Sequence, residues 1–363
     1  DGKKDLVVFD SDKVFIGKNT GEAFEYESKG DGIKVDETND KIFVEDIDND
    51  GYADFIIIDK KGSRYYINDK KSNFAGKDKK ELPAKTDKGN RIMFTDISKN
   101  KLPDLVVVTS SSVEVYRNKG SGKFDDKPST LTKSLGKNLK VNSKNSKNPV
   151  YLADVNNDKY PDLVIFSDDS VSVCLSDGGK KFEDANEWVK SEFTIDNGYM
   201  DNVNNPRFVE DVNGNGMADI VGFSEAGVEI GYNQDSKFST AKLVVDGFNA
   251  GVGIKSFDKT KNQVFFIDMN KDGKADVVTF GPKEVFVTLS KGSALGSPEV
   301  WLRSPIKNVS WTKNTLIKVV DLNNDGYPDI IAFNPKGVVI AFNDEGKGFS
   351  DAFKDEKSSK LTS

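Results

Sequence analysis

The sequence of 363 residues contains no histidine and only one cysteine. Without histidine the chain lacks the commonest general base, the usual transition-metal ligand, and any Ser-His or Cys-His nucleophile pair. Cys174 has no partner for an intrachain disulfide, and its apolar neighbours in Val171–Leu175 predict a small core residue. These absences disfavour the common hydrolytic and redox enzymes.

Long apolar stretches are also missing. No apolar run approaches the roughly 20 residues of a membrane span, so we expect no membrane insertion by this segment. The first residues, Asp1–Asp5, lack the pattern of a signal peptide, and we interpret them as a mature or trimmed end. Helical periodicity is scarce, and only residues 183–191 favour a turn or two of helix.

The formal net charge of −7 predicts no nucleic-acid partner. Nineteen acids lie in the recurring loops described next. Without them, 40 acidic residues face 52 basic ones, which leaves +12 on the rest of the chain. The lysines look scattered rather than clustered, and this pattern favours a solvated surface.

One nine-residue motif recurs along the chain and is most complete at Asp46–Asp54. It places oxygen-bearing side chains at positions 1, 3, 5 and 9, and glycine at position 6 permits a tight turn. Strand-like patterns flank it, and position 12 is not Glu, so it is no EF-hand. Complete copies start at Asp46, Asp96, Asp154, Asp211, Asp268 and Asp321, and a partial copy starts at Asp1.

Each repeat reads as four strands. One strand enters the loop, a nearly all-apolar strand leaves it, a third alternates, and a weaker fourth follows a turn such as Asn118–Phe124. Four antiparallel strands repeated about seven times predict an all-β, seven-bladed β-propeller that spans residues 1–363 as one domain. The partial first copy predicts a first blade without its first strand. The tail, Ser358–Ser363, is too short and polar to be favoured as a replacement.

Oxygen-only ligation at this spacing favours calcium, with a position-7 carbonyl as a further ligand. The Asp46 copy is the most charged, with Asp46, Asp48, Asp50, Asp54 and the Tyr52 carbonyl. The other predicted ligands are Asp268, Asn270, Asp272, Lys274 and Asp276; Asp321, Asn323, Asp325, Tyr327 and Asp329; Asp211, Asn213, Asn215, Met217 and Asp219; and Asp154, Asn156, Asp158 and Asp162.

The copies are unequal. The Asp211 copy offers only two carboxylates, and weaker binding is expected. In the Asp154 copy Lys159 replaces glycine, and occupancy stays open. The Asp96 copy, with Ser98, Asn100, Asp104 and Lys101, is predicted to be metal-free, and Lys101 is a candidate for a charge contact there. Turn Asp and Asn residues also bond their own backbone, which is the alternative for every copy. Bound calcium is expected to be structural.

The motif resembles the FG-GAP/VCBS repeat, which builds the seven-bladed propeller of integrin α-subunits and of some fungal lectins. The phased copies cover essentially the whole chain. The resemblance implies a calcium-bearing propeller that is secreted or lies at the cell surface. It also implies a role in adhesion or in lectin-like recognition of a protein or glycan.

A binding module is therefore the favoured function, with no catalytic residues and with the ligand and its binding residues left open. Trp188, Trp301 and Trp311 are candidates for stacking on sugar rings, although packing in or over the blades is favoured. The alternatives are a structural scaffold within a larger surface protein and, less favoured, an enzyme of the lyase or dehydratase type.

Overall fold

A computed structural model describes residues 2–10, 13–21, 23–36, 40–59, 62–71, 74, 80–82, 90–109, 111–132, 148–199, 205–224, 226–246, 263–281, 284–292, 294–303, 315–334, 337–350 and 353–355. Regular structure in these residues consists of strands and a single-turn 3-10 helix, Ile195–Asn197. None of the helical structure described here is long and apolar enough to cross a membrane. Trp311 and the tail at residues 358–363 lie outside the described residues.

The strands form seven antiparallel sheets, in which strands that are consecutive in the chain are hydrogen-bonded neighbours. Blades 1 to 3 contain β1 (Leu6–Asp10), β2 (Lys13–Asn19) and β3 (Phe24–Asp31); β4 (Lys41–Glu45), β5 (Asp54–Asp59), β6 (Gly62–Tyr66) and β7 (Lys80–Glu81); and β8 (Arg91–Thr95), β9 (Asp104–Val108), β10 (Val113–Tyr116) and β11 (Ser129–Thr132). Blades 4 and 5 contain β12 (Val150–Ala153), β13 (Asp162–Phe166), β14 (Ser170–Cys174) and β15 (Asn186–Lys190); and β16 (Arg207–Glu210), β17 (Asp219–Ser224), β18 (Gly227–Gly231) and β19 (Lys242–Asp246). Blades 6 and 7 contain β20 (Gln263–Ile267), β21 (Asp276–Phe280), β22 (Glu284–Thr288) and β23 (Glu299–Arg303); and β24 (Leu316–Val320), β25 (Asp329–Asn334), β26 (Gly337–Ala341) and β27 (Phe353–Asp355).

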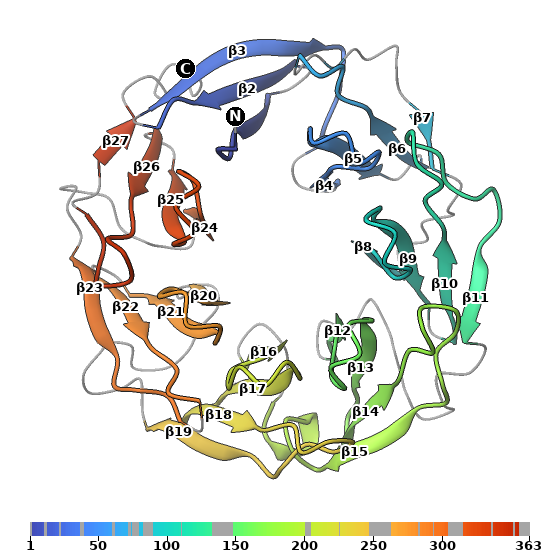
Figure 1. Cartoon of the computed structure of the whole chain (residues 1–363), viewed down its shortest axis with the longest axis vertical. Helices are drawn as coiled ribbons and strands as arrows, with labels where there is room; N and C mark the ends of the chain where they lie inside the picture. The colour runs from blue at the N-terminus through green and yellow to red at the C-terminus, as the bar shows by residue number, and fades with distance from the viewer. Residues whose placement is uncertain are drawn as a thin grey trace.

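The sheets stand around a common axis, with β4, β8, β12, β16, β20 and β24 innermost (Figure 1). The prediction of an all-β, seven-bladed propeller is confirmed. In the described residues blade 1 has three strands, and β1 pairs only with β2. Because β1 directly follows the partial loop, it corresponds to the second strand of the other blades. The predicted absence of the first strand is therefore confirmed for the described residues.

The apolar second strand of each blade holds the ring together. In β5, Phe55 and Ile57 join the core between blades 1 and 2, whereas Ile56 and Ile58 join the core between blades 2 and 3. Successive side chains of a strand point to opposite faces, so a strand packed on both faces needs an apolar residue at every position. A similar core closes the ring, where Leu6 of blade 1 packs with Leu322 of blade 7.

The prediction of helical turns at residues 183–191 is wrong, because this segment contains strand β15. The pairing of β15 with β14 shifts register between Val171 and Ser172, which leaves Trp188 as an extra residue. Trp188 and Val189 are then buried side by side, and this breaks the alternation that marks a strand. Trp301 occupies the matching position in blade 6 and is also buried, so both tryptophans pack within the fold.

A side-chain hydrogen bond repeats between blades. Asn118 Nδ2 in blade 3 donates to the Ile47 carbonyl in blade 2 over 2.7 Å. The same bond joins Asn233 to Val155 (2.7 Å), Asn343 to Met269 (3.0 Å) and Asn19 to Leu322 (2.8 Å), and Ser290 Oγ makes it to Val212. We call these bonds the inter-blade clasps. The Asn19 clasp connects blade 1 to blade 7.

Candidate functional site

The six complete loops share one backbone conformation. In the first of them, Asp46 Oδ1 and Oδ2 accept the N–H groups of Asp50 (3.1 Å) and Gly51 (2.9 Å). The position-6 residue has positive φ in every loop, including Lys101 (68°) and Lys159 (72°), where glycine is replaced. Position 4 also has positive φ, as at Asn49 (58°), which the sequence motif did not predict. The turn therefore forms with or without a full set of acids.

The Asp46 loop brings three carboxylates together. Oxygen atoms of Asp46, Asp48 and Asp50 lie within 4.8 Å of one another, and no other such acidic group occurs in the described residues. Asp48 Oδ1 is buried and accepts no hydrogen bond. Burial raises the pKa of Asp48, and repulsion from Asp50 and Asp46 adds to the increase. An orphaned carboxylate oxygen beside two further acids fits a hard divalent cation.

The position-9 aspartates are bound to the backbone. Asp54, only 1% exposed, accepts the N–H of Ile47 at Oδ2 (2.9 Å) and that of Asn68 at Oδ1 (2.7 Å). Asp162, Asp219, Asp276 and Asp329 bind the matching two N–H groups. Burial raises the pKa of Asp54 to about 7. These carboxylates join the loop to the end of the third strand, a role that sequence reasoning missed.

In other loops, the acidic side chain at position 5 has a neighbouring side chain as its partner. Asn156 Nδ2 donates to Asp158 (3.1 Å), and Asn323 Nδ2 donates to Asp325 (2.8 Å). Lys274 forms an ion pair with Asp272 at 3.0 Å. The position-7 residues Tyr52, Met217, Lys274 and Tyr327 each donate their backbone N–H to the position-5 side chain. The loops thus have the same backbone conformation but differ in how their acidic side chains are neutralised.

The Asp96 loop contains an internal cation. Arg117 Nη1 lies 3.1 Å from Asp104 Oδ2, and Ser98 Oγ lies 3.3 Å from the same oxygen. Lys101 forms no ion pair in the part of the chain that the structure describes, so the charge contact expected from Lys101 is made by Arg117 instead. Arg117 directly follows strand β10, which sequence spacing did not connect with the loop.

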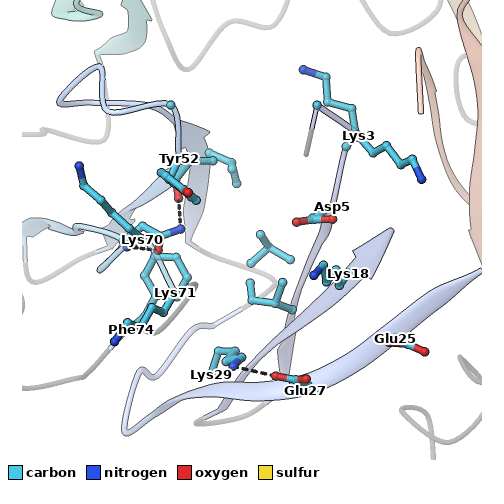
Figure 2. A pocket seen from close by; sticks show the side chains of 18 residues that line it. Lys3, Asp5, Lys18, Glu25, Glu27, Lys29, Tyr52, Lys70, Lys71 and Phe74 are labelled. Atoms are coloured by element: carbon cyan, nitrogen blue, oxygen red, sulfur yellow. Dashed lines mark hydrogen bonds and ion pairs between the residues drawn. The ribbon is translucent and has the colours of Figure 1, made fainter. Parts of the chain in front are cut away.

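A cleft of about 910 Å³ opens between blades 1 and 2 beside the Asp46 loop. Val7, Ile16 and Phe74 supply apolar surface to it, and Tyr52, 44% exposed, lies at the loop. Figure 2 shows Tyr52, Lys70 and Lys71 of blade 2 across from the charged residues of blade 1. Because Tyr52 is also position 7 of the Asp46 loop, the cleft and the acidic cluster share a segment.

Lysines gather in this cleft, and the expectation that the lysines are scattered is wrong there. The lining contains Lys3, Lys4, Lys18, Lys29, Lys70 and Lys71, against the acids Asp5, Glu25 and Glu27. The six come from four separate stretches of sequence, which the turns of blades 1 and 2 bring together. No local sequence pattern marks such a cluster, because its members are far apart in the chain.

Comparisons with known proteins support the repeat and the fold. Residues 46–107 and 96–164 match the FG-GAP-like repeat. An Agrocybe aegerita lectin, described as recognising non-reducing terminal N-acetylglucosamine, has a TM-score of 0.84 at 24% identity, over 100% of this chain and 93% of the lectin. A Lactobacillus plantarum protein has a TM-score of 0.54 at 11% identity, over 97% of this chain and 94% of that protein. The Photorhabdus luminescens Tc holotoxin pore has a TM-score of 0.52 at 14% identity, over 95% of this chain and 16% of the toxin chain.

No curated protein sequence matches this chain. At the identities above, the structural likenesses show a shared fold. The repeat match and the seven antiparallel sheets together show a propeller that carries FG-GAP-like repeats.

Proposed function

We propose that this seven-bladed propeller with FG-GAP-like repeats is a calcium-stabilised module that binds a glycan in the cleft between blades 1 and 2. The observation that carries the proposal is the cleft itself, which combines apolar surface, an exposed aromatic ring and charged groups from two blades. A fold shared with a lectin supports it.

The chemistry of the lining suits a saccharide. A sugar ring has one apolar face and many hydroxyl groups, and the exposed ring of Tyr52 offers a surface for the apolar face. Carboxylates such as Glu25 accept hydrogen bonds from hydroxyls, and lysine ammonium groups donate them. A volume of about 910 Å³ falls in the range of ligand clefts and accommodates more than one sugar ring.

Calcium is proposed for the Asp46 loop, where Asp46, Asp48 and Asp50 with Asp54 and the Tyr52 carbonyl would hold it. The ion would supply the positive charge that offsets three converging carboxylates. Such a loop lacks the bidentate position-12 Glu of tight intracellular sensors, so we propose weak sites suited to the high calcium concentration outside cells. This supports a secreted or cell-surface module.

We propose binding without catalysis because Glu27, an acidic residue of the cleft, does not show the raised pKa that a general acid requires. Glu25 and Glu27 are acids in the cleft that lie outside the metal loops. A general acid for sugar chemistry needs a raised pKa, whereas the hydrogen bond from Lys29 lowers the pKa of Glu27. The arrangement therefore favours recognition over a lyase reaction.

A glycan array probed in calcium, followed by titration of any saccharide that gives a signal, tests the function. The variant Tyr52→Ala should weaken binding, since it removes the exposed ring from the cleft. Tyr327→Ala is the matched control, because Tyr327 occupies position 7 of the blade 7 loop and does not line the cleft. A folded protein that binds no saccharide, or equal losses in both variants, would contradict the proposal.

A further inference from the structure

We infer that the cleft selects an anionic saccharide, one that carries carboxylate or sulfate groups, over a neutral one. The inference rests on the proposed glycan function and adds the charge class of the ligand. Its basis is a reversal of charge: the chain carries −7, whereas six lysines and three acids line the cleft. The cleft is thus a positive region on a negative protein.

Several of the lysines are held by protein groups. Lys29 forms an ion pair with Glu27 at 2.7 Å, and Lys3 Nζ donates to the Thr20 carbonyl at 3.0 Å. Lys70 lies 3.5 Å from Asp50, but 64% of its side chain is exposed. These contacts place ammonium groups along the blade 1 wall and beside the acidic loop.

Lys4, Lys18 and Lys71 remain for a ligand. All three are exposed, and none forms an ion pair in the described residues. Lys18 lies opposite Glu25 in the pairing of β2 with β3, and its charge adds to the stronger effect of Lys29 in lowering the pKa of Glu27. Lys18 belongs to strand β2 of blade 1, and Lys71 follows strand β6 of blade 2, so they flank the cleft from opposite sides (Figure 2). Two exposed ammonium groups on opposite sides of one cleft suit acidic groups on a ligand that lies between them.

The acids in the cleft restrict the type of anion. Glu25 and Glu27 lie on strand β3, two residues apart, and therefore on the same face of the strand. They would repel a uniformly charged polyanion such as nucleic acid. A saccharide with anionic groups on some positions and hydroxyls on others meets both the ammonium groups and the carboxylates. The mixed lining therefore favours a partly charged sugar chain.

Isothermal titration with matched oligosaccharides in calcium tests the inference. The ligands are a neutral N-acetylglucosamine oligomer, a uronic-acid oligomer of equal length and a sulfated oligomer. We expect at least one acidic ligand to bind about tenfold more tightly than the neutral one, with an affinity that falls as salt rises. The uronic-acid and sulfated arms identify which anionic group is recognised.

The double variant Lys18→Ala/Lys71→Ala should lose about tenfold in affinity for the acidic ligand and keep its affinity for the neutral one. Lys180→Ala/Lys242→Ala removes two exposed lysines of blades 4 and 5 and serves as the matched control. Melting curves confirm that both variants fold. Equal or tighter binding of the neutral ligand overturns the inference and leaves the glycan function standing, whereas no binding of any saccharide overturns both.

Discussion

The loops that begin at Asp46 and Asp96 have the same backbone conformation but differ in charge. Negative charge accumulates in the first loop and is neutralised by an arginine in the second. In both, the position-1 aspartate accepts N–H groups from positions 5 and 6, and the position-9 aspartate is buried at the end of the loop. In the Asp46 loop three carboxylates converge and one oxygen is left without a partner. In the Asp96 loop a guanidinium from Arg117 lies at the buried carboxylate.

This difference separates two roles of one motif. The acids at positions 1 and 9 shape the turn and connect it to the third strand in both loops, whatever lies at positions 3 and 5. Positions 3 and 5 decide whether negative charge accumulates. A loop can therefore lose its attraction for a cation and still build its blade, provided that another group neutralises the buried aspartate.

Removing the proposed calcium should have the largest effect on the protein. We expect chelation to lower the melting temperature markedly, because acids such as Asp46, Asp48 and Asp50 repel one another without a cation. One site at a hundred times its dissociation constant contributes about 2.7 kcal/mol, and several sites contribute together. Differential scanning calorimetry with and without chelator measures the change. An unchanged melting temperature would show that a bound metal does not stabilise these loops.

The pH dependence of the chelated protein should be the next largest effect. Burial raises the pKa of Asp54 to about 7 and that of Asp276 to about 6, from an ordinary 3.8. The folded state then binds more protons than the unfolded state between these values, so stability falls as pH rises from about 4 to about 7. We expect the slope of stability against pH to shrink in Asp54→Asn and to shrink less in Asp104→Asn. Burial also raises the pKa of Asp104, but the N–H of Asn118 and the charge of Arg117 oppose that rise.

Thermal melts across this pH range, in chelator and in excess calcium, provide the measurement. Excess calcium should flatten the curve by competing with protons for the loop acids. A chelated protein whose stability rises between pH 4 and 7 would contradict the assignment of raised pKa values to the position-9 aspartates.

Removal of the internal cation should destabilise the Asp96 loop more than the Asp46 loop. Arg117→Ala leaves Asp104 buried without its cation, at a cost of about 3 kcal/mol. Lys70→Ala is the matched change at the Asp46 loop, and it should cost less than about 0.5 kcal/mol because 64% of the Lys70 side chain is exposed. Urea unfolding in chelator compares the two variants. Similar losses of unfolding free energy in the two variants would show that the Asp96 loop does not depend on its internal cation more than the Asp46 loop does.

Exchange of the position-6 residues should have the smallest effect. Lys101 has φ of 68°, a conformation that costs a side chain about 1 kcal/mol, so Lys101→Gly should be neutral or slightly stabilising. Gly51→Lys should lose about 1 kcal/mol, since φ is 88° and an added Cβ meets no atom within 4 Å. Urea unfolding again measures both changes. A loss well above this size for Gly51→Lys would indicate more than backbone strain.

Much of the fold was predictable because its determinants are local. Alternation, the all-apolar second strand and the phased loops lie within each repeat, so the blades and the three-stranded first blade followed from sequence. Cys174 proves to be buried as expected, and burial raises its thiol pKa to about 12. The prediction of helical turns around Trp188 failed because a β-bulge places two neighbouring side chains on one face of the strand.

The site was predictable only where its residues are adjacent in sequence. Convergence of Asp46, Asp48 and Asp50 follows from their spacing within one turn. The partner of Asp104, Arg117, lies 13 residues away, directly after strand β10, and the clasp from Asn118 reaches a different blade. Lining residues of the cleft extend from Gly2 to Phe74, and only the three-dimensional arrangement of two blades unites them.

The clasp between Asn19 and Leu322 also bears on the order in which the protein folds. It spans 303 residues, whereas the clasps from Asn118 and Asn343 span 71 and 74. Closing the longer loop costs about 1 kcal/mol more in chain entropy. Each blade uses consecutive strands and can form as the chain emerges during synthesis. Ring closure is then a single late event, and until it occurs the apolar faces of blades 1 and 7 are open to other chains.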